Sequence, residues 1–463
     1  MKPKDLLKLG FPQGPAIGAA TRLAAAIEDE MTTDAIEHEL KAILADPSAH
    51  LEHAHFADVA RILHSAANAP AFVEREKPAD YQIWGEGLEE GALNQMHHAV
   101  RLPVAVRGAL MPDAHQGYGL PIGGVLATEN AVIPYAVGVD IACRMKLSVF
   151  DVPAADMKRL DQQLTQTLQR ETLFGTGARF KKPYDHEVLE KDWNATPITR
   201  RLFPKAREQL GTSGSGNHFA EFGVFTIDKP DLGLQPGQYL AVLSHSGSRG
   251  SGAQVADFYS RLAMEQHPEL PPELKRLAWL DLDSDAGQEY WAAMNLMGEY
   301  AHGNHAIIHQ KITKALGFKV IAGVENHHNF AWKEEHDGKE LIVHRKGATP
   351  AGKDALGVIP GSMASPGFVV RGKGKPESLD SASHGAGRVM SRTAARNQFR
   401  WNHIKPLLEE RGVKLLSAGI DENPLVYKDI HQVMAAQADL VDIVARFDPK
   451  IVKMADAGEK PED

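Results

Sequence analysis

The spacing of hydrophobic and polar positions changes near residue 83. Residues 1–70 repeat apolar side chains with helical spacing, and the pair Thr33-Asp34, with Glu37 in capping-box position, can cap a helix that runs to Leu44. Residues 70–82 are polar and contain two prolines, so we place a linker at 71–82. The pattern thus predicts a helical appendage over 1–70, a linker, and one larger domain over 83–463.

Within 83–463, short β-branched runs such as YLAVLSHS and ELIVHRKG alternate with glycine-rich loops, as in buried strands that end in loops. Helical periodicity predicts helices at 154–170, 251–265, 284–316 and 389–408. The order of strands and helices is irregular. The fold class we expect is therefore α+β, with irregular mixed sheets, rather than a doubly wound parallel sheet.

Composition excludes several classes of protein. The single cysteine, Cys143, excludes an intramolecular disulfide and any zinc module built on two or four cysteines. The chain starts without the apolar stretch of a signal peptide, and it has no run of 18 apolar residues. We therefore expect no membrane span and a reducing, cytoplasmic location.

Charge is distributed unevenly along a chain whose net charge is −9. Residues 1–100 hold 8 basic and 16 acidic side chains, whereas residues 344–405 hold 11 basic and 3 acidic ones. A local basic excess of this size can attract a polyanion despite the global sign. A solvated basic face is the alternative interpretation.

One carboxylate, one thiol and three histidines lie in loop contexts typical of metal ligands. Asp140 and Cys143 share the turn GVDIACRM, and His218, His245 and His328 each lie beside a glycine- or serine-rich loop or at the end of an apolar run. This donor set suits manganese, zinc or iron, in a borderline or dinuclear site, better than magnesium, which prefers oxygen. The alternative is that each is an ordinary buried or surface side chain.

Two further patterns leave alternatives open. His302, His305 and His309 repeat with helical spacing and form either a metal-binding face or a plain helix surface. In HGAGRVMSR, Gly385 and Gly387 open a predicted helix followed by arginines, which is typical of an anion site. A neutral His384 before such a site could attack phosphorus, whereas the alternative is a glycine-permitted turn with a capping histidine.

Several motifs in this order resemble the RtcB family of RNA-splicing ligases. The resemblance covers about residues 83–453 and rests on MPDAHQGYGLPIGG, GVDIACRM, GNHFAEF, HSGSRG, HHN, HRKGAT, PGSM, SHGAGRVMSR and YKDI. It implies an RtcB-like catalytic core and an enzyme that joins RNA carrying a 2′,3′-cyclic phosphate or 3′-phosphate to RNA carrying a 5′-hydroxyl. It also implies two Mn²⁺ ions and GTP as cofactors.

The resemblance assigns roles to individual residues. It implies that Asp140, Cys143 and His218 bind one ion, that Cys143, His245 and His328 bind the other, and that His384 is the nucleophile that takes GMP from GTP. The residues that it places on the nucleotide are Asn217, His218, Phe219, Ala220, Glu221, His328, Asn329, Pro360, Gly361, Ser362, Met363, His384, Gly385, Ala386 and Gly387.

The chain departs from the family pattern at three places. Gly367 is expected on the nucleotide but stands where the family usually has a serine in the guanine pocket. Lys453 is expected there because it is in the nearest register to the family's terminal lysine, which is placed on the guanine, with Lys450 as its competitor. The acidic helical N-terminus has no match in the family pattern. These departures leave the nucleotide preference open and favour a divergent branch, for RNA repair rather than tRNA splicing.

Two other functions fit the same residues. The first is a dinuclear metal phosphodiesterase that opens cyclic phosphates without ligation and does not need His384. The second is a non-catalytic module that binds guanine nucleotides or RNA ends, with RNA held by Arg345, Lys346, Arg388 and Arg392. The ligase, unlike either alternative, forms a covalent histidine–GMP adduct.

Overall fold

The computed structural model describes residues 1–12, 15–68 and 72–459. The chain divides into two compact units, one formed by residues 1–73 with 264–275 and the other by residues 74–263 with 276–463. The domain and linker boundaries expected at residues 70 and 82 stay predictions. None of the helices in the described residues has the length and apolarity that crossing a membrane requires.

The N-terminal residues form short helices around an aliphatic core. The helices are α1 (Pro3–Leu9), α2 (Pro15–Ala26), α3 (Thr33–Ala45), the 3-10 helix η1 (Pro47–His50) and α4 (Ala57–Asn68). Leu6, Leu40 and Ile43 are fully buried in this core. The cap of α3 is Thr32, whose hydroxyl accepts the Ala35 N–H, so the cap expected at Thr33-Asp34 was wrong by one to two residues.

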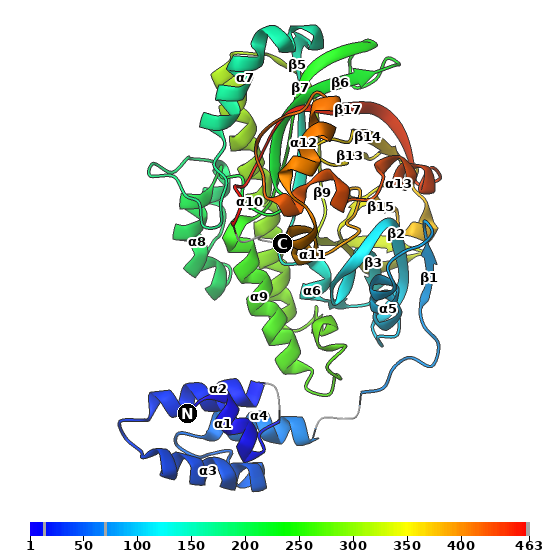
Figure 1. Ribbon diagram of the computed structural model, residues 1–463. Coiled ribbons are helices and arrows are strands. Elements are labelled where there is room, and N and C mark those ends of the chain that lie inside the picture. Colours follow the sequence, from blue (N-terminus) through cyan, green and yellow to red (C-terminus); the bar gives the residue numbers. More distant parts are fainter. Residues whose placement is uncertain (13–14, 69–71, 460–463) are drawn as a thin grey trace. The chain divides into compact units, whose positions relative to one another are not determined.

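Two main sheets build the second unit (Figure 1). The five-stranded sheet has the order β1 (Asp80–Ile83), β2 (Ala105–Tyr118), β3 (Leu120–Thr128), β11 (Lys339–Lys346), β10 (Phe330–His336). The eight-stranded sheet has the order β13 (Leu356–Ile359), β14 (Gly367–Gly372), β17 (Val441–Met454), β6 (Phe219–Ile227), β7 (Gly237–Ser246), β5 (Arg144–Pro153), β9 (Val320–His327), and β16 (Lys414–Ser417) pairs with β17. Two small pairs are β4 (Ala131–Val132) with β8 (Leu280–Asp281) and β12 (Ala348–Pro350) with β15 (Ser381–Ser383).

Helices cover these sheets and connect them. They are α5 (Glu90–Ala99), α6 (Pro134–Val137), α7 (Met157–Glu171), α8 (Pro197–Gln209), α9 (Arg249–Gln266), α10 (Asp285–Leu316), α11 (Arg392–Gln398), α12 (Trp401–Glu410) and α13 (Ile430–Ala436). Short 3-10 helices are η2 (Ala154–Asp156), η3 (Glu187–Glu190), η4 (Lys275–Leu277), η5 (Pro376–Ser378), η6 (Ile420–Glu422) and η7 (Pro424–Val426). The mixture of parallel and antiparallel pairs with segregated helices confirms the expected α+β class.

The eight-stranded sheet curls until its end strands approach each other. Asn326 of β9 bridges to β13 by accepting the Val358 N–H at 2.8 Å. Strand alternation places Met145 and Leu147 in the core inside the curl, whereas Phe150 on the same strand packs outward on Leu164 and Ile308 of α7 and α10. This near-closure leaves an open end at which loops can gather.

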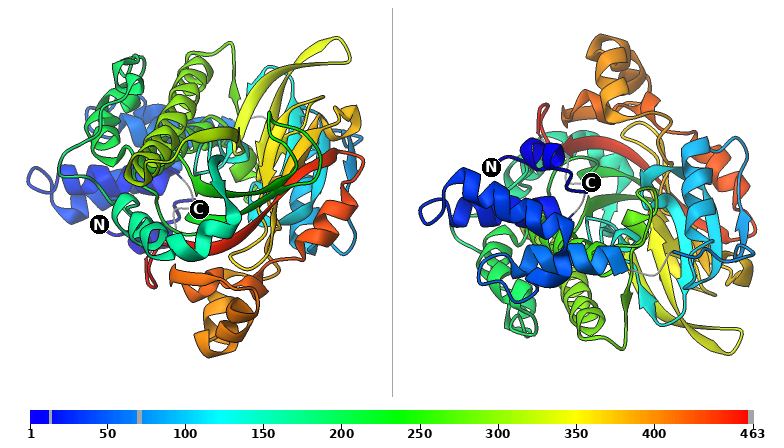
Figure 2. Two further views of the ribbon diagram at one scale, coloured as in Figure 1. Left: turned by 90° about the horizontal axis from the view of Figure 1, so that it is seen from above. Right: turned by 90° about the horizontal axis from the view of Figure 1, so that it is seen from below.

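The predicted helix over 389–408 is wrong as a single element. Phe399 and Arg400 have extended backbones, which separate α11 from α12. The helix also does not open at Gly385 and Gly387, because α11 begins at Arg392 with Ser391 as its cap. The two helices lie at the periphery of the second unit (orange in Figure 2).

The sequence left two alternatives for His302, His305 and His309 of α10, a metal-binding face or a plain helix surface. The structure instead shows two of them in contacts inside the protein. His305 and His309 are buried, and the hydroxyl of Ser244 lies 3.2 Å from Nδ1 of the first and 2.9 Å from Nε2 of the second. His302 contacts Glu325 at 2.8 Å. The helical spacing correctly predicted that the three histidines lie on one face of α10. That face is mostly buried because β7 packs against it.

Candidate active site

Three antiparallel strand pairs bring the candidate metal ligands to one end of the eight-stranded sheet. Cys143 precedes β5, His218 precedes β6, and His245 lies near the end of β7. Because β7 is antiparallel to both neighbours, the starts of β5 and β6 meet its end, and the register places His245 opposite both Met145 and Phe219. His328 follows β9, whose end meets the start of β5 in the same way.

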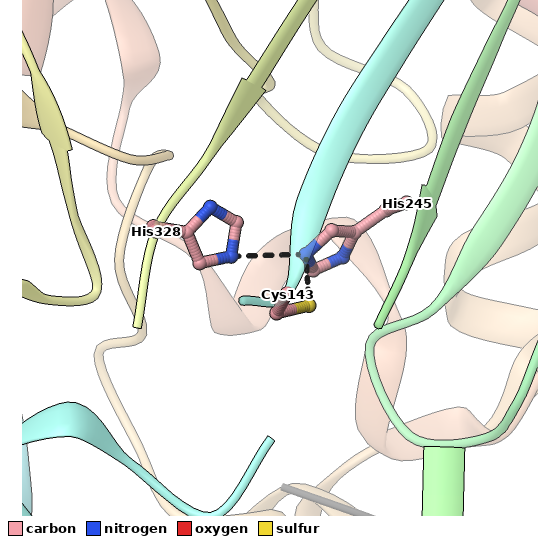
Figure 3. A group of neighbouring side chains, drawn as sticks. All are labelled: Cys143, His245 and His328. Atoms are coloured by element: carbon pink, nitrogen blue, oxygen red, sulfur yellow. Dashed lines mark hydrogen bonds between the residues drawn. The ribbon is translucent and has the colours of Figure 1, made fainter. Parts of the chain in front are cut away.

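The side chains at this end form two groups that share one thiol. In the first group, the ligand atoms of Cys143, His245 and His328 all lie within 4.8 Å of one another; in the second, those of Asp140, Cys143 and His218 do. The Cys143 sulfur lies 3.0 Å from His245 Nε2 and 3.3 Å from His218 Nε2. Figure 3 shows one nitrogen of His245, its Nε2, joined by dashed lines to this sulfur and to His328, whose Nε2 is 3.2 Å away.

The electrostatics of the two groups fit a bound cation. Burial lowers the pKa of His245 to about 3 and the pKa of His328 well below its usual value, so both imidazoles are neutral at neutral pH, as metal ligands must be. Burial raises the pKa of Asp140, but the His218 hydrogen bond and the nearby charges outweigh it and bring the pKa to about 2. The Asn217 carbonyl oxygen lies 3.2 Å from His245 Nδ1 and can only accept, so Nδ1 donates and Nε2 keeps its lone pair toward the cluster.

A glycine loop places His384 beside this cluster. Its ring centroid lies 4.9 Å from that of His328. Asp113 of β2, 271 residues away in sequence, accepts from His384 Nδ1 at 2.8 Å and from the backbone N–H groups of His384 and Gly385 at 3.2 Å each. Residues 384–388 therefore form a loop and not the first turn of a helix, because α11 begins only at Arg392. The N–H groups of His384 and Gly385 donate to the Asp113 carboxylate.

Asp113 is a site residue that the motif MPDAHQGYG contains but that sequence reasoning did not assign. It is fully buried. Burial raises its pKa, but the hydrogen bond and the charge of His384 outweigh burial and hold the pKa below its usual value. An ionised Asp113 fixes the hydrogen on His384 Nδ1 and leaves Nε2 as the free nucleophilic nitrogen. A carboxylate directly after the apolar run at 109–112 of β2 was the signal that could have identified it.

One cavity of about 600 Å³ joins the cluster, His384 and the loops of both main sheets. All five candidate metal ligands line it. So do these residues expected on the nucleotide: Asn217, His218, Phe219, Glu221, His328, Asn329, Pro360, Gly361, Ser362, Met363, Gly367, His384, Gly385, Ala386 and Gly387. Ala220 does not, because strand alternation places it in the core on the other face of β6.

Comparison with known proteins identifies the family. The family model described as tRNA-splicing ligase RtcB matches residues 95–196 and 179–454. The RNA-splicing ligase RtcB of Escherichia coli (strain K12) is 32% identical over 397 residues, which covers 79% of this chain and 95% of that protein. The chain belongs to the RtcB family. Similar relatives are the RNA-splicing ligase RtcB of Mycobacterium tuberculosis, 33% identical over 77% of this chain and 98% of that protein, and the tRNA-splicing ligase RtcB of Archaeoglobus fulgidus, 31% identical over 78% and 88%.

Lys453, which we expected to contact the nucleotide, does not line the cavity. On β17 its neighbours Val452 and Met454 line the cavity, so alternation turns Lys453 to the opposite face. Its Nζ donates to the carbonyl oxygens of Leu168, Gln169 and Thr172 at 3.1–3.2 Å, at the C-terminus of α7. The Lys453 ammonium group thus caps the C-terminal carbonyl groups of α7.

We expect Lys453→Met to lower stability without changing nucleotide affinity. Loss of a cation and three hydrogen bonds at the end of α7 should cost about 1–2 kcal/mol of unfolding free energy. Lys450 on the same strand makes one hydrogen bond, to the Arg411 carbonyl oxygen, and offers Lys450→Met as the matched control with a smaller loss. Chemical denaturation and a GTP titration check the result. Unchanged stability with weaker GTP binding would place Lys453 on the nucleotide.

The basic residues considered for RNA binding separate into two kinds. Lys346, Arg388 and Arg392 line the cavity. Arg345 is only 1% exposed, and its guanidinium is held by Glu334 at 2.6 and 2.9 Å and by Ser381 at 2.7 Å. The expectation that Arg345 holds RNA was wrong, because the five-stranded sheet encloses it in an internal ion pair.

Proposed function

We propose that this RtcB-family chain is an RNA ligase that uses GTP and manganese. It joins RNA 2′,3′-cyclic phosphate or 3′-phosphate ends to 5′-hydroxyl ends through a histidine–GMP intermediate. The observation that carries the proposal is the placement of a tautomer-fixed His384 beside two metal-binding groups in one cavity. The names of its relatives, RNA-splicing and tRNA-splicing ligases, support the same conclusion.

The donor set supports two ions that share the Cys143 thiolate. Asp140, Cys143 and His218 would hold one ion, and Cys143, His245 and His328 would hold the other. Buried thiolate and neutral imidazole ligands favour manganese, zinc or iron over magnesium, and manganese is the choice that the family implies. When bound, the ions supply positive charge that stabilises charge developing on phosphoryl oxygens.

The order of bond changes is the one that the family resemblance implies. Water first opens a 2′,3′-cyclic phosphate by breaking its bond to the 2′-oxygen, which leaves a 3′-phosphate and a 2′-hydroxyl. His384 Nε2 attacks the α-phosphorus of GTP, so that a nitrogen–phosphorus bond forms and pyrophosphate leaves. An oxygen of the RNA 3′-phosphate then displaces the histidine and carries GMP. The 5′-hydroxyl of the second RNA finally attacks the 3′-phosphorus, loses its proton and expels GMP. Asp113 holds the imidazole in one tautomer during the two steps that involve His384.

The nucleotide would occupy the part of the cavity formed by β6, β17 and the loop over 360–366. Glu221 is buried there, and burial raises its pKa well above its usual value. A neutral carboxyl can both donate to and accept from a base edge. Gly367 also lines this part of the cavity but has no side chain that could bond the base. The experiment must therefore measure which nucleotide the protein prefers.

The decisive experiment incubates the pure protein with manganese and GTP labelled at the α-phosphate. A ligase gives an acid-labile protein adduct, and it joins an RNA that ends in a cyclic phosphate to one that begins with a 5′-hydroxyl. A phosphodiesterase opens the cyclic phosphate without an adduct, and a binding module does neither. Parallel reactions with labelled ATP test the base preference.

We expect Asp113→Asn to slow formation of the GMP adduct by about 100- to 10,000-fold, because an amide can donate to Nδ1 and select the wrong tautomer. Asp231→Asn, which breaks an ion pair with Arg371 outside the cavity, is the matched control and should keep the wild-type rate. Adduct formation is followed with labelled GTP, and thermal unfolding reports the fold. A rate within threefold of wild type would remove Asp113 from the mechanism.

A further inference from the structure

The rim of the cavity carries an exposed aromatic side chain that the proposed chemistry does not use. Tyr118, in the tight connection between β2 and β3, is 58% exposed and lines the cavity together with His384 and Lys346. Isolated exposed hydrophobic residues are ordinary on protein surfaces. This one differs because it lies at the entrance to a site that handles phosphate groups.

A cation is stacked on the same ring. The guanidinium carbon of Arg276 lies 4.3 Å from the centroid of the Tyr118 ring and 5.9 Å from that of Tyr135. Arg276 is itself exposed. The pair therefore presents flat faces together with a positive charge, the combination by which proteins bind unpaired nucleotides.

The connection that carries Tyr118 is tightly held. Gly119 has φ +71°, and a Cβ there would meet the Arg276 carbonyl oxygen at 2.5 Å, so the turn and the Arg276 backbone are in close contact. Lys346 Nζ donates to the Tyr118 carbonyl oxygen. The backbones that carry the two side chains are thus held together before any ligand binds, which reduces the entropy lost on binding.

We propose that Tyr118 and Arg276 form a stacking platform for an unpaired nucleobase next to the reacting end of the RNA. Asp113, which positions His384, lies five residues earlier on the same strand, at most about 18 Å away along the chain. Because Tyr118 and His384 line the same cavity, a base on the platform would lie in the cavity that holds the reacting phosphate. The proposal deepens the proposed function, since it assumes that RNA ends enter this cavity.

Binding of RNA that contains 2-aminopurine tests the platform without requiring ligation. Two single-stranded RNAs carry the fluorescent base as the last nucleotide, one at a 3′-phosphate end and one at a 5′-hydroxyl end. We expect wild type to change the fluorescence of at least one of them by stacking. Tyr118→Ala should abolish that change and weaken binding by about 5- to 150-fold, the range that follows from loss of one base–aromatic stack. Tyr118→Phe and Tyr118→Trp should restore both.

Two further variants separate stacking from charge and from folding. Arg276→Ala should lower the slope of log Kd against log salt by about one, whereas Tyr118→Ala should leave the slope unchanged because it removes no charge. Phe258→Ala alters an aromatic residue that is 44% exposed on α9 and does not line the cavity, and it should bind RNA as wild type does. Thermal midpoints identify any variant that has lost its fold.

The outcomes for the platform and for the ligase are distinct. Equal affinity and fluorescence change in wild type and Tyr118→Ala would overturn the platform even if wild type ligates RNA. Tyr118-dependent binding by a wild type that forms no GMP adduct would keep the platform and overturn the ligase. Weaker binding in Tyr118→Phe and Tyr118→Trp as large as in Tyr118→Ala would also overturn the platform, because both variants retain an aromatic ring.

Discussion

Cys143→Ala is expected to lose both metal ions and all ligation. The Cys143 sulfur belongs to both ligand groups, 3.0 Å from His245 Nε2 in one and 3.3 Å from His218 Nε2 in the other. In the proposed two-ion site, removing the sulfur would take one ligand from each ion at once and leave each group with two protein ligands. Elemental analysis of the purified variant should find less than about a tenth of the wild-type metal, and RNA joining should fall below detection.

The control for this variant must separate the effect of losing a metal ligand from the effect of leaving an empty volume in the core. Met145 of β5 follows Cys143 by two residues, is fully buried and lines the same cavity, so Met145→Ala removes more volume without removing a ligand. It should lose stability but retain metal. Undiminished metal in Cys143→Ala would show that the thiol is not a ligand. Metal content that falls by half would indicate that it serves one ion only.

His384→Ala is expected to keep the fold, the metal ions and RNA binding but to form no GMP adduct. The ring makes its contact to Asp113 at the edge of the metal cluster, and it belongs to neither ligand group. The variant should still join an RNA whose 3′-phosphate already carries GMP, because the last step needs no protein nucleophile. Labelled GTP measures the first reaction, and gel analysis of the preactivated RNA measures the second.

An exposed histidine provides the comparison. His403 of α12 does not line the cavity, and His403→Ala should form the adduct at the wild-type rate. An adduct in His384→Ala would identify another residue as the nucleophile. Failure to join preactivated RNA, with metal content intact, would mean that the imidazole also acts in the final step.

Most residues of the cavity can be found from the sequence motifs alone. Asp140, Cys143, His218, His245 and His328 each lie next to a strand-like run or a glycine loop, and the fold brings all five together. The reason is topological: antiparallel neighbours alternate in direction, so starts and ends of successive strands meet at one edge of a sheet. What the sequence could not supply was the direction of each side chain.

Two properties that the sequence did not reveal explain its wrong predictions: the direction of individual side chains and the position of one break in a helix. Lys453 and Ala220 lie on the faces of β17 and β6 that point away from the cavity, because one residue of register reverses the face. Arg345 is enclosed by Glu334. The predicted helix at 389–408 is interrupted at Phe399 and Arg400, which local propensity did not reveal.

By itself, the sequence determined the family, the α+β class and the ligand types, since these depend on residue identity and on short-range spacing. Tertiary structure alone decided the pairing of Asp113 with His384 across 271 residues and the stacking of Arg276 on Tyr118. Both contacts join segments that are distant in the chain. Their geometry is set by tertiary contacts between these segments, and no local pattern of residues records it.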